Sequence, residues 1–150
     1  PGTRRDIENR LDDLVFRKVP DLTIACNPAN DTVTSIPIIC FTTQPATFTP
    51  RPFTLAAHIV RITAQAKWRW TWGDGNSEWR SVPGKPYPST QITHQYRTAG
   101  DFNVVVDSRW SAIYTVAGVG TFQAGGQAIT QEDDVSIRVH SAKTVRTVSK

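Results

Sequence analysis

The sequence lacks the features that mark several large classes of protein. It has only two cysteines and no methionine, and no apolar run approaches the roughly 18 residues that a membrane-spanning helix needs. We therefore expect no transmembrane segment. The chain begins "PGTRR", with neither an initiating Met nor the apolar core of a signal peptide, so we expect any export signal or anchor to have been removed.

Motifs for catalysis, phosphate binding and metal binding are also missing. The chain contains no Gly-x-Ser-x-Gly, no His-Glu-x-x-His and no glycine loop for phosphate, and His58 and His140 stand isolated. The two cysteines have no further thiolate or imidazole ligand near them, which argues against zinc. We predict that the protein is not an enzyme, and we expect no cofactor and no metal site.

The charge is modest and basic. Lys and Arg number 17 against 13 Asp and Glu, for a formal net charge of +4, and the basic excess lies largely near the two ends. Because the sequence has no basic stripe and no helix-turn-helix, zinc-finger or RNA-binding motif, we do not expect nucleic acid as a partner. An apolar fraction of 39% with 20% charged residues is typical of a globular chain, and 150 residues suffice for one domain with its own core.

Helix signals are confined to the first residues, where an amphipathic helix is predicted over residues 4–17. The apolar residues at helical spacing are Ile7, Leu11, Leu14 and Val15. From Pro20 onward, β-branched and aromatic residues recur in short runs that Pro, Gly, Asn and Asp interrupt, which is typical of an all-β sandwich of two sheets. The predicted strands are residues 22–26, 35–41, 53–66, 67–72, 92–96, 102–110, 113–119 and 134–140.

Two segments are predicted to be surface loops. "RSVPGKPYPST" (80–90) contains three prolines and cannot be a central strand. In "GTFQAGGQAITQEDD" (120–134), two adjacent glycines and the run Glu132, Asp133 and Asp134 favour a turn. These acids could be considered as calcium ligands, but neighbours in an extended stretch point apart, so we expect no calcium site.

Residues 68–79 read "WRWTWGDGNSEW", which is the pattern of a strand that runs into a turn. Side chains alternate between the faces of a strand, so three tryptophans at every second position share one face and their neighbours share the other. The tetrapeptide Gly73-Asp74-Gly75-Asn76 then has the composition of a tight reversal.

"WTWGDG" at 70–75, followed by "HQY" at 94–96 and "AGDFNVVV" at 99–106, resembles the PKD (polycystin-type) domain. The resemblance implies an immunoglobulin-like β-sandwich over about residues 35–139, and the order of the motifs is similar to exported actinobacterial PKD-domain proteins. Two positions depart from the pattern, since Thr71 replaces the usual Asp and Trp72 the usual Phe. The residues that match the structural motif are Trp70, Trp72, Gly73, Asp74, Gly75, His94, Tyr96 and Gly100.

The resemblance also implies structural roles for residues that could be mistaken for a catalytic set. Asp74 is expected to accept backbone N–H groups in its own turn, and His94 and Tyr96 to bond to that turn or an adjacent loop. Trp70 and Trp72 are expected in the core. The remaining aromatic residues belong either to the core or to an exposed platform that stacks sugar rings: Trp68, Trp79, Trp110 and Tyr114.

Cys26 and Cys40 both lie in extended segments. An even count fits one disulfide in an exported protein, and two buried thiols are the alternative. We expect three regions: an N-terminal helical lead (1–19), a PKD-like sandwich (20–142) and a basic tail (143–150).

These observations predict a non-catalytic, secreted or cell-surface interaction or assembly module whose partner is a protein or a cell-envelope component. The binding residues that we predict are Trp79, Arg80 and Tyr87, on or beside the proline-rich loop, where Tyr, Trp and Arg are the side chains that most often anchor interfaces. An inert insertion is the alternative for this loop. For the whole chain, the alternatives are a carbohydrate-binding module with polysaccharide as partner, and a structural subunit of a surface fibre or virion-like particle.

Overall fold

The computed structural model describes residues 19–123 and 129–142. The helix predicted over residues 4–17 and the basic tail 143–150 lie outside the described residues. The strands are β1 (Ile24–Asn27), β2 (Asp31–Val33), β3 (Ile38–Thr42), β4 (Thr47–Phe48), β5 (Phe53–Leu55), β6 (His58–Thr71), β7 (Ser77–Arg80), β8 (Thr93–His94), β9 (Gly100–Val116), β10 (Gly120–Gln123) and β11 (Ile129–His140).

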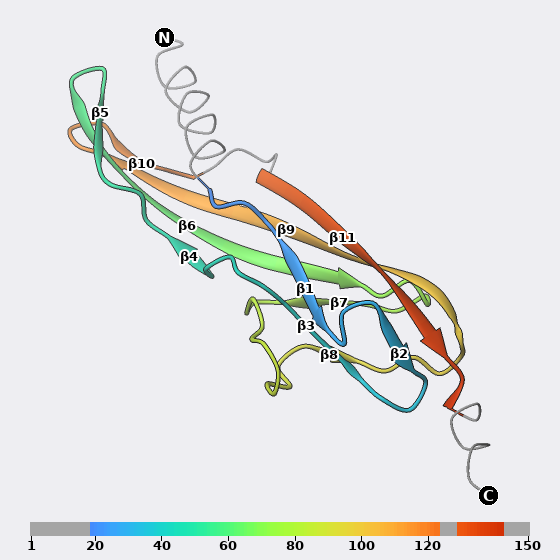
Figure 1. The fold of residues 1–150 in the computed structure, drawn as a ribbon. Helices are drawn as coiled ribbons and strands as arrows, with labels where there is room; N and C mark the ends of the chain where they lie inside the picture. Colours follow the sequence, from blue (N-terminus) through green and yellow to red (C-terminus); the bar gives the residue numbers. More distant parts are fainter. Residues whose placement is uncertain (1–18, 124–128, 143–150) are drawn as a thin grey trace, which may run out of the picture.

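The strands form two sheets (Figure 1). The smaller sheet has the order β1-β3-β8, and the larger has the order β2-β11-β9-β6-β4, with β5 and β7 also on β6 and β10 also on β9. Paired strands are antiparallel except β2, which runs parallel to β11. The prediction of an all-β, immunoglobulin-like sandwich is confirmed.

Two long strands form the centre of the larger sheet. β6 and β9 pair without interruption from Val60↔Val116 to Thr71↔Val105. The prediction of two strands in place of each is wrong, because buried and exposed residues alternate through both strands with no turn residue to break them. The first half of β6 and the second half of β9, together with β5 and β10, form an arm that extends beyond the smaller sheet (Figure 1).

The arm is closed by a two-residue turn that the sequence did not reveal. Leu55 pairs with His58, so Ala56 and Ala57 alone connect β5 to β6, with φ angles of 50° and 66°. Such turns usually contain Asn and Gly, which tolerate a positive φ, and an Ala-Ala pair gives no turn signal. This explains why residues 53–66 read as one strand.

The inner face of the long strands carries the core. Trp68, Trp70, Trp72 and Trp110 are at most 1% exposed, and the Trp70 and Trp72 rings stack with centroids 5.6 Å apart. Val104 and Val106 of β9 and Ile38 of β3 are also fully buried. The aromatic rings fill the space between the two sheets, which in a domain of this size provides much of the buried apolar area.

A buried polar network ties the beginning of the described chain to this core. The Trp68 indole N–H donates to Gln44 Oε1 at 2.9 Å, and Gln44 Nε2 donates to the Pro20 carbonyl at 2.7 Å and to Gln131 Oε1 at 2.6 Å. Gln131 also donates to Pro20 and accepts from Trp110. Buried amides of this kind are tolerated because their polar atoms are satisfied.

The disulfide is confirmed, because Cys26 and Cys40 are bonded and are directly opposite each other on β1 and β3.

The prediction of a loop over residues 120–134 is wrong at both ends of this segment, where β10 and β11 form. β11 pairs with β9 from Ile129↔Trp110 onward, and this ladder places Glu132, Asp133 and Asp134 inside a strand.

These three acids point to alternate sides of β11. Glu132 and Asp134 are exposed, whereas the half-buried Asp133 accepts the Ile24 N–H at 3.0 Å and so links β11 to the smaller sheet. In residues 19–123 and 129–142, no three His, Cys, Asp or Glu side chains gather as metal ligands would, and no helix is long and apolar enough to cross a membrane.

We expect Ala57→Gly to raise the free energy of unfolding by about 0.5–1 kcal/mol, because glycine adopts a positive φ without the Cβ penalty. Ala117→Gly is the matched control, since Ala117 also lies in a turn of the arm but has no positive φ. That variant should be neutral or less stable. Chemical denaturation would measure both, and a loss of stability in Ala57→Gly would contradict the turn geometry.

Candidate functional site

The turn between β6 and β7 is the first of two candidate sites. Gly73 and Gly75 have φ angles of 88° and 93°, and a Cβ on Gly73 would lie 2.8 Å from the Asn103 carbonyl oxygen. The Trp72 N–H donates to the Asn76 carbonyl at 3.0 Å, and the Asn76 N–H donates to Asp74 Oδ1 at 3.1 Å. Asp74 therefore accepts a backbone N–H within its own turn.

His94 and Tyr96 fasten this turn to the rest of the sandwich. His94 Nε2 lies 2.7 Å from Asp74 Oδ2, and the Tyr96 hydroxyl donates to the Trp72 carbonyl at 2.6 Å. The His94 ring stacks on Trp72 with centroids 4.7 Å apart, and Tyr96 stacks on Phe102. Gly100, another motif residue, begins β9 next to the same cluster.

The electrostatics of the cluster follow from these contacts. Burial alone raises the pKa of Asp74, but the hydrogen bonds from His94 and the Asn76 N–H, with the charge of His94, outweigh burial and hold this pKa below its ordinary value. Burial, and then the charge of Asp74, raise the pKa of Tyr96. These polar groups are engaged with one another and with the turn, so the arrangement joins β6, β7 and β8 mechanically.

The second candidate site is the outer face of the larger sheet around Trp79. This side chain is 45% exposed, and the guanidinium carbons of Arg69 and Arg109 lie 5.5 Å and 5.0 Å from its ring centre. Both distances are within the range of cation–π contacts. Arg69 also pairs with Asp107 at 3.3 Å. The Trp79 ring is therefore held against β6 and β9 while much of its surface remains exposed to solvent.

A hollow lies next to Trp79, where β4 and β7 leave a gap along the edge of β6, and its apolar lining comes from Ala46, Ala66 and Trp110. It has a volume of about 420 Å³, and its cations are Lys67 and Arg109. Its neutral polar lining comes from Thr47, Gln65, Ser81 and Ser111. Together, Trp79, Arg69, Arg109 and the hollow define what we call the basic face.

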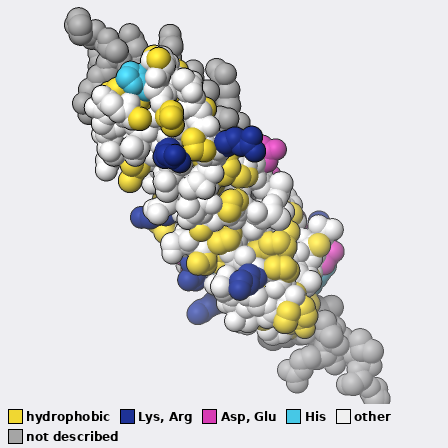
Figure 2. All heavy atoms as spheres, turned by 90° about the vertical axis from the view of Figure 1, so that its left-hand side faces the viewer, with side chains coloured by type: hydrophobic (Ala, Val, Ile, Leu, Met, Phe, Trp, Pro, Cys, Tyr) yellow, Lys and Arg dark blue, Asp and Glu magenta, His cyan; other side chains and the backbone are white. Residues whose placement is uncertain are grey.

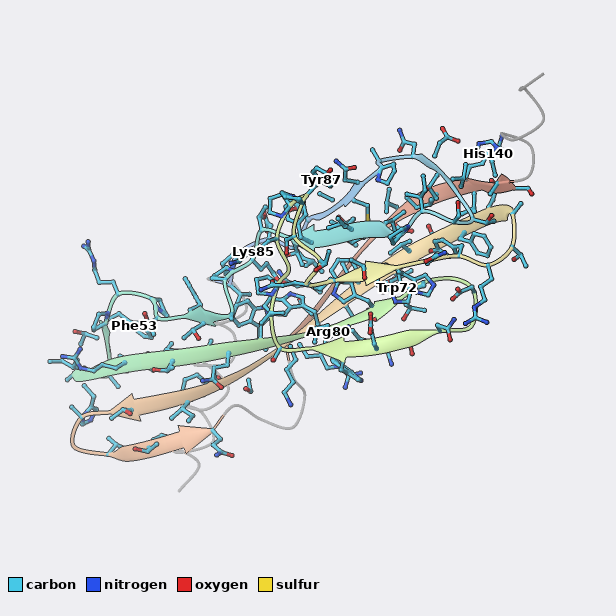
Figure 3. The ribbon with its side chains drawn as sticks, turned by 90° about the horizontal axis from the view of Figure 1, so that it is seen from below. Phe53, Trp72, Arg80, Lys85, Tyr87 and His140 are labelled. Carbon is cyan, nitrogen blue, oxygen red and sulfur yellow. A yellow bond between two sulfur atoms is a disulfide. The ribbon has the colours of Figure 1, made fainter. Side chains whose placement is uncertain are left out.

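The other two predicted binding residues do not join this face. Arg80 pairs with Glu78 at 2.9 Å, and both alternate with Trp79 on β7 and so point to the opposite side of the strand. Tyr87 is 67% exposed on the proline-rich loop, next to the smaller sheet and well apart from Arg80 (Figure 3). The structure thus places the three residues in three different surroundings.

Most of the aromatic residues that the sequence assigned either to the core or to an exposed platform are in the core. Trp68, Trp110 and Tyr114 are fully buried, and within the described ranges Trp79 and Tyr87 are the exposed aromatic side chains. The described residues therefore present no row of exposed aromatic rings of the kind that a sugar chain would stack on. On the side of the molecule in Figure 2, Lys and Arg are spread along the length, while Asp and Glu lie at one margin.

Sequence reasoning singled out Trp79 but missed its companions. Arg69 and Arg109 are far apart in the sequence, and only the pairing of β6 with both β7 and β9 brings them to one ring. The alternation of residues 67–72 had already placed Lys67 and Arg69 opposite the tryptophans. What it did not contain was the register of the neighbouring strands.

The family model of the PKD domain matches residues 40–108. This segment begins at the disulfide, includes the turn cluster and ends within β9. Residues 109–116 of β9 lie outside it, and so do β10 and β11. PKD domains are generally non-catalytic interaction modules of extracellular proteins. A search of curated proteins found no match to this chain.

We expect Asp74→Asn to lower the free energy of unfolding by about 1–2 kcal/mol near neutral pH. The amide oxygen can still accept the Asn76 N–H, but the negative charge of the carboxylate opposite His94 is lost. The pKa of Asp74 is lower in the folded state than in the unfolded chain, where it is about 3.9. The contribution of the carboxylate is therefore present above that value and is lost as the pH falls through the folded pKa.

Thermal melts between about pH 6 and pH 2 would measure this dependence. The difference between parent and Asp74→Asn should shrink toward the acid end. Asp101→Asn, which removes the exposed partner of Arg138, is the control and should change stability little at any pH. A difference for Asp74→Asn that stays constant over the range would contradict the role assigned to this carboxylate.

Proposed function

We propose that the protein is a non-catalytic recognition module, secreted or displayed at the cell surface, that binds a protein partner through the basic face. The observation that carries this proposal is the position of Trp79. It is a large aromatic side chain, about half exposed, that two arginines hold in place on the sheet surface. Trp and Arg are enriched among the residues that dominate the energy of protein interfaces.

The fold supports recognition by a rigid surface. The basic face is built on paired strands and not on a loop, so its side chains lose little freedom when a partner docks. The PKD match favours interaction with proteins, and the disulfide favours an oxidising compartment outside the cytoplasm. The actinobacterial likeness noted from the motifs remains a prediction about the origin of the chain.

The two alternatives receive less support. A carbohydrate-binding module would be favoured by exposed aromatic rings in a row, and Trp68, Trp110 and Tyr114 are buried instead. A fibre subunit would be favoured by an open sheet edge that pairs with another copy. No described strand pairs with the outer edge of β11 over residues 129–137, but acids lie along it, and charges on an edge oppose strand addition.

To test the proposal, the biotinylated chain would be used to capture proteins from a surface and secreted extract of the producing organism. We expect a defined set of proteins to be retained by the parent and by Tyr87→Ala, and to be lost at least about tenfold from Trp79→Ala. Tyr87→Ala is the matched control, because it removes an exposed aromatic side chain outside the basic face.

Stability must be measured in parallel. Trp79→Ala should change the free energy of unfolding by no more than about 1 kcal/mol, since the side chain is half exposed. Trp70→Ala, by contrast, should cost about 3–5 kcal/mol. Equal capture by Trp79→Ala and the parent would contradict the proposal, and so would retention that depends on polysaccharide alone.

A further inference from the structure

The hollow beside Trp79 contains two cations that face each other. Lys67 on β6 and Arg109 on β9 are direct partners in the ladder, and both side chains are exposed on the outer face. Like charges in directly opposite positions destabilise an antiparallel sheet. The free protein therefore carries an electrostatic cost at this point.

Two acids lie on the same outer face as these cations, Asp107 of β9 and its ladder partner Glu132 of β11, but neither forms an ion pair with them. Among residues 19–123 and 129–142, no carboxylate forms an ion pair with Lys67 or Arg109. Asp107 is the outer-face neighbour of Arg109 on β9, but its carboxylate already forms an ion pair with Arg69. The lining of the hollow includes no Asp or Glu. Its neutral polar members are hydroxyl and amide side chains that can donate hydrogen bonds, and Ala46, Ala66 and Trp110 form the rest of its wall.

We propose that the hollow is a binding site for a carboxylate of an acidic segment in the protein partner, an inference that rests on the function proposed above. The guanidinium of Arg109 is suited to paired hydrogen bonds with a carboxylate, and the ammonium of Lys67 adds a second positive charge. Ser81 and Ser111 line the hollow and offer hydroxyl donors to the remaining lone pairs. A bound carboxylate also offsets the repulsion between Lys67 and Arg109, which favours the bound state.

The position of Trp79 favours an acidic peptide over an acidic sugar chain. The indole contacts Arg109, so a chain that places a carboxylate in the hollow passes directly beside an apolar ring. Neighbouring side chains of a peptide can pack on that ring. A sugar chain gains most from successive aromatic rings, and the other exposed aromatic residue of the described chain, Tyr87, lies on the loop beside the smaller sheet.

The test uses a capped hexaglutamate peptide as probe, at constant ionic strength, with binding measured by calorimetry and mapped by backbone NMR shifts. We expect the shifts to centre on Lys67, Arg109 and Trp79. Lys67→Gln and Arg109→Gln should each weaken binding about tenfold or more. Lys85→Gln is the matched control, because it removes one exposed charge on the proline-rich loop, and its affinity should stay within about twofold of the parent.

A second readout needs no ligand. Without peptide, Lys67→Gln should raise Tm by about 1–2 °C because it relieves the like-charge pair, whereas Lys85→Gln should leave Tm unchanged. A lower Tm for Lys67→Gln would overturn the proposal. It would also be overturned by equal losses of affinity in Lys67→Gln and Lys85→Gln, or by tighter binding of oligogalacturonate than of hexaglutamate.

The two proposals fail in different ways. If hexaglutamate does not bind but capture of surface proteins still depends on Trp79, the carboxylate site is wrong and the basic face stands. If hexaglutamate binds in the hollow but capture is the same for Trp79→Ala and the parent, the carboxylate site stands and the proposed use of the basic face is wrong.

Discussion

The unbroken pairing of β6 with β9 is the constraint on which the rest of the structure depends. Because side chains alternate along both strands, one register decides for the whole length of the sheet which residues are buried and which are exposed. Trp68, Trp70 and Trp110 fall on the inner side, and Lys67, Arg69 and Arg109 fall on the outer side. The core and the basic face are therefore two consequences of the same ladder, and a shift by one residue would exchange them.

The turn cluster and the polar network hold this ladder at two points. Asp74, His94 and Tyr96 join the end of β6 to β7 and β8, while Gln44 and Gln131 join the middle of the sheet to the chain at Pro20. With β7 fixed, Trp79 lies opposite Arg69 and its indole stays against both arginines. The motif that identifies the fold thus positions the candidate interface without taking part in it.

Local patterns predicted much of the fold, and pairing between distant strands explains what they missed. The tryptophan alternation and the Gly73-Asp74-Gly75 turn are properties of a short segment, so they were visible in the sequence. The continuity of β9, the Ala56-Ala57 turn and the strand over Glu132–Asp134 depend on ladders with partners elsewhere in the chain. For the same reason, Trp79 could be proposed from its residue type, but Arg109 and the separation of Arg80 and Tyr87 from Trp79 could not.

Quenching of tryptophan fluorescence tests the central claim most directly, which is that the ladder buries four of the five tryptophans and leaves Trp79 exposed in a basic setting. We expect the anionic quencher iodide to reach a minor fraction of the emission, and caesium to be less effective because Arg69, Arg109 and Lys67 repel it. Trp79→Phe should abolish this accessible fraction. Quenching that is unchanged in Trp79→Phe, or stronger with caesium than with iodide, would contradict the account.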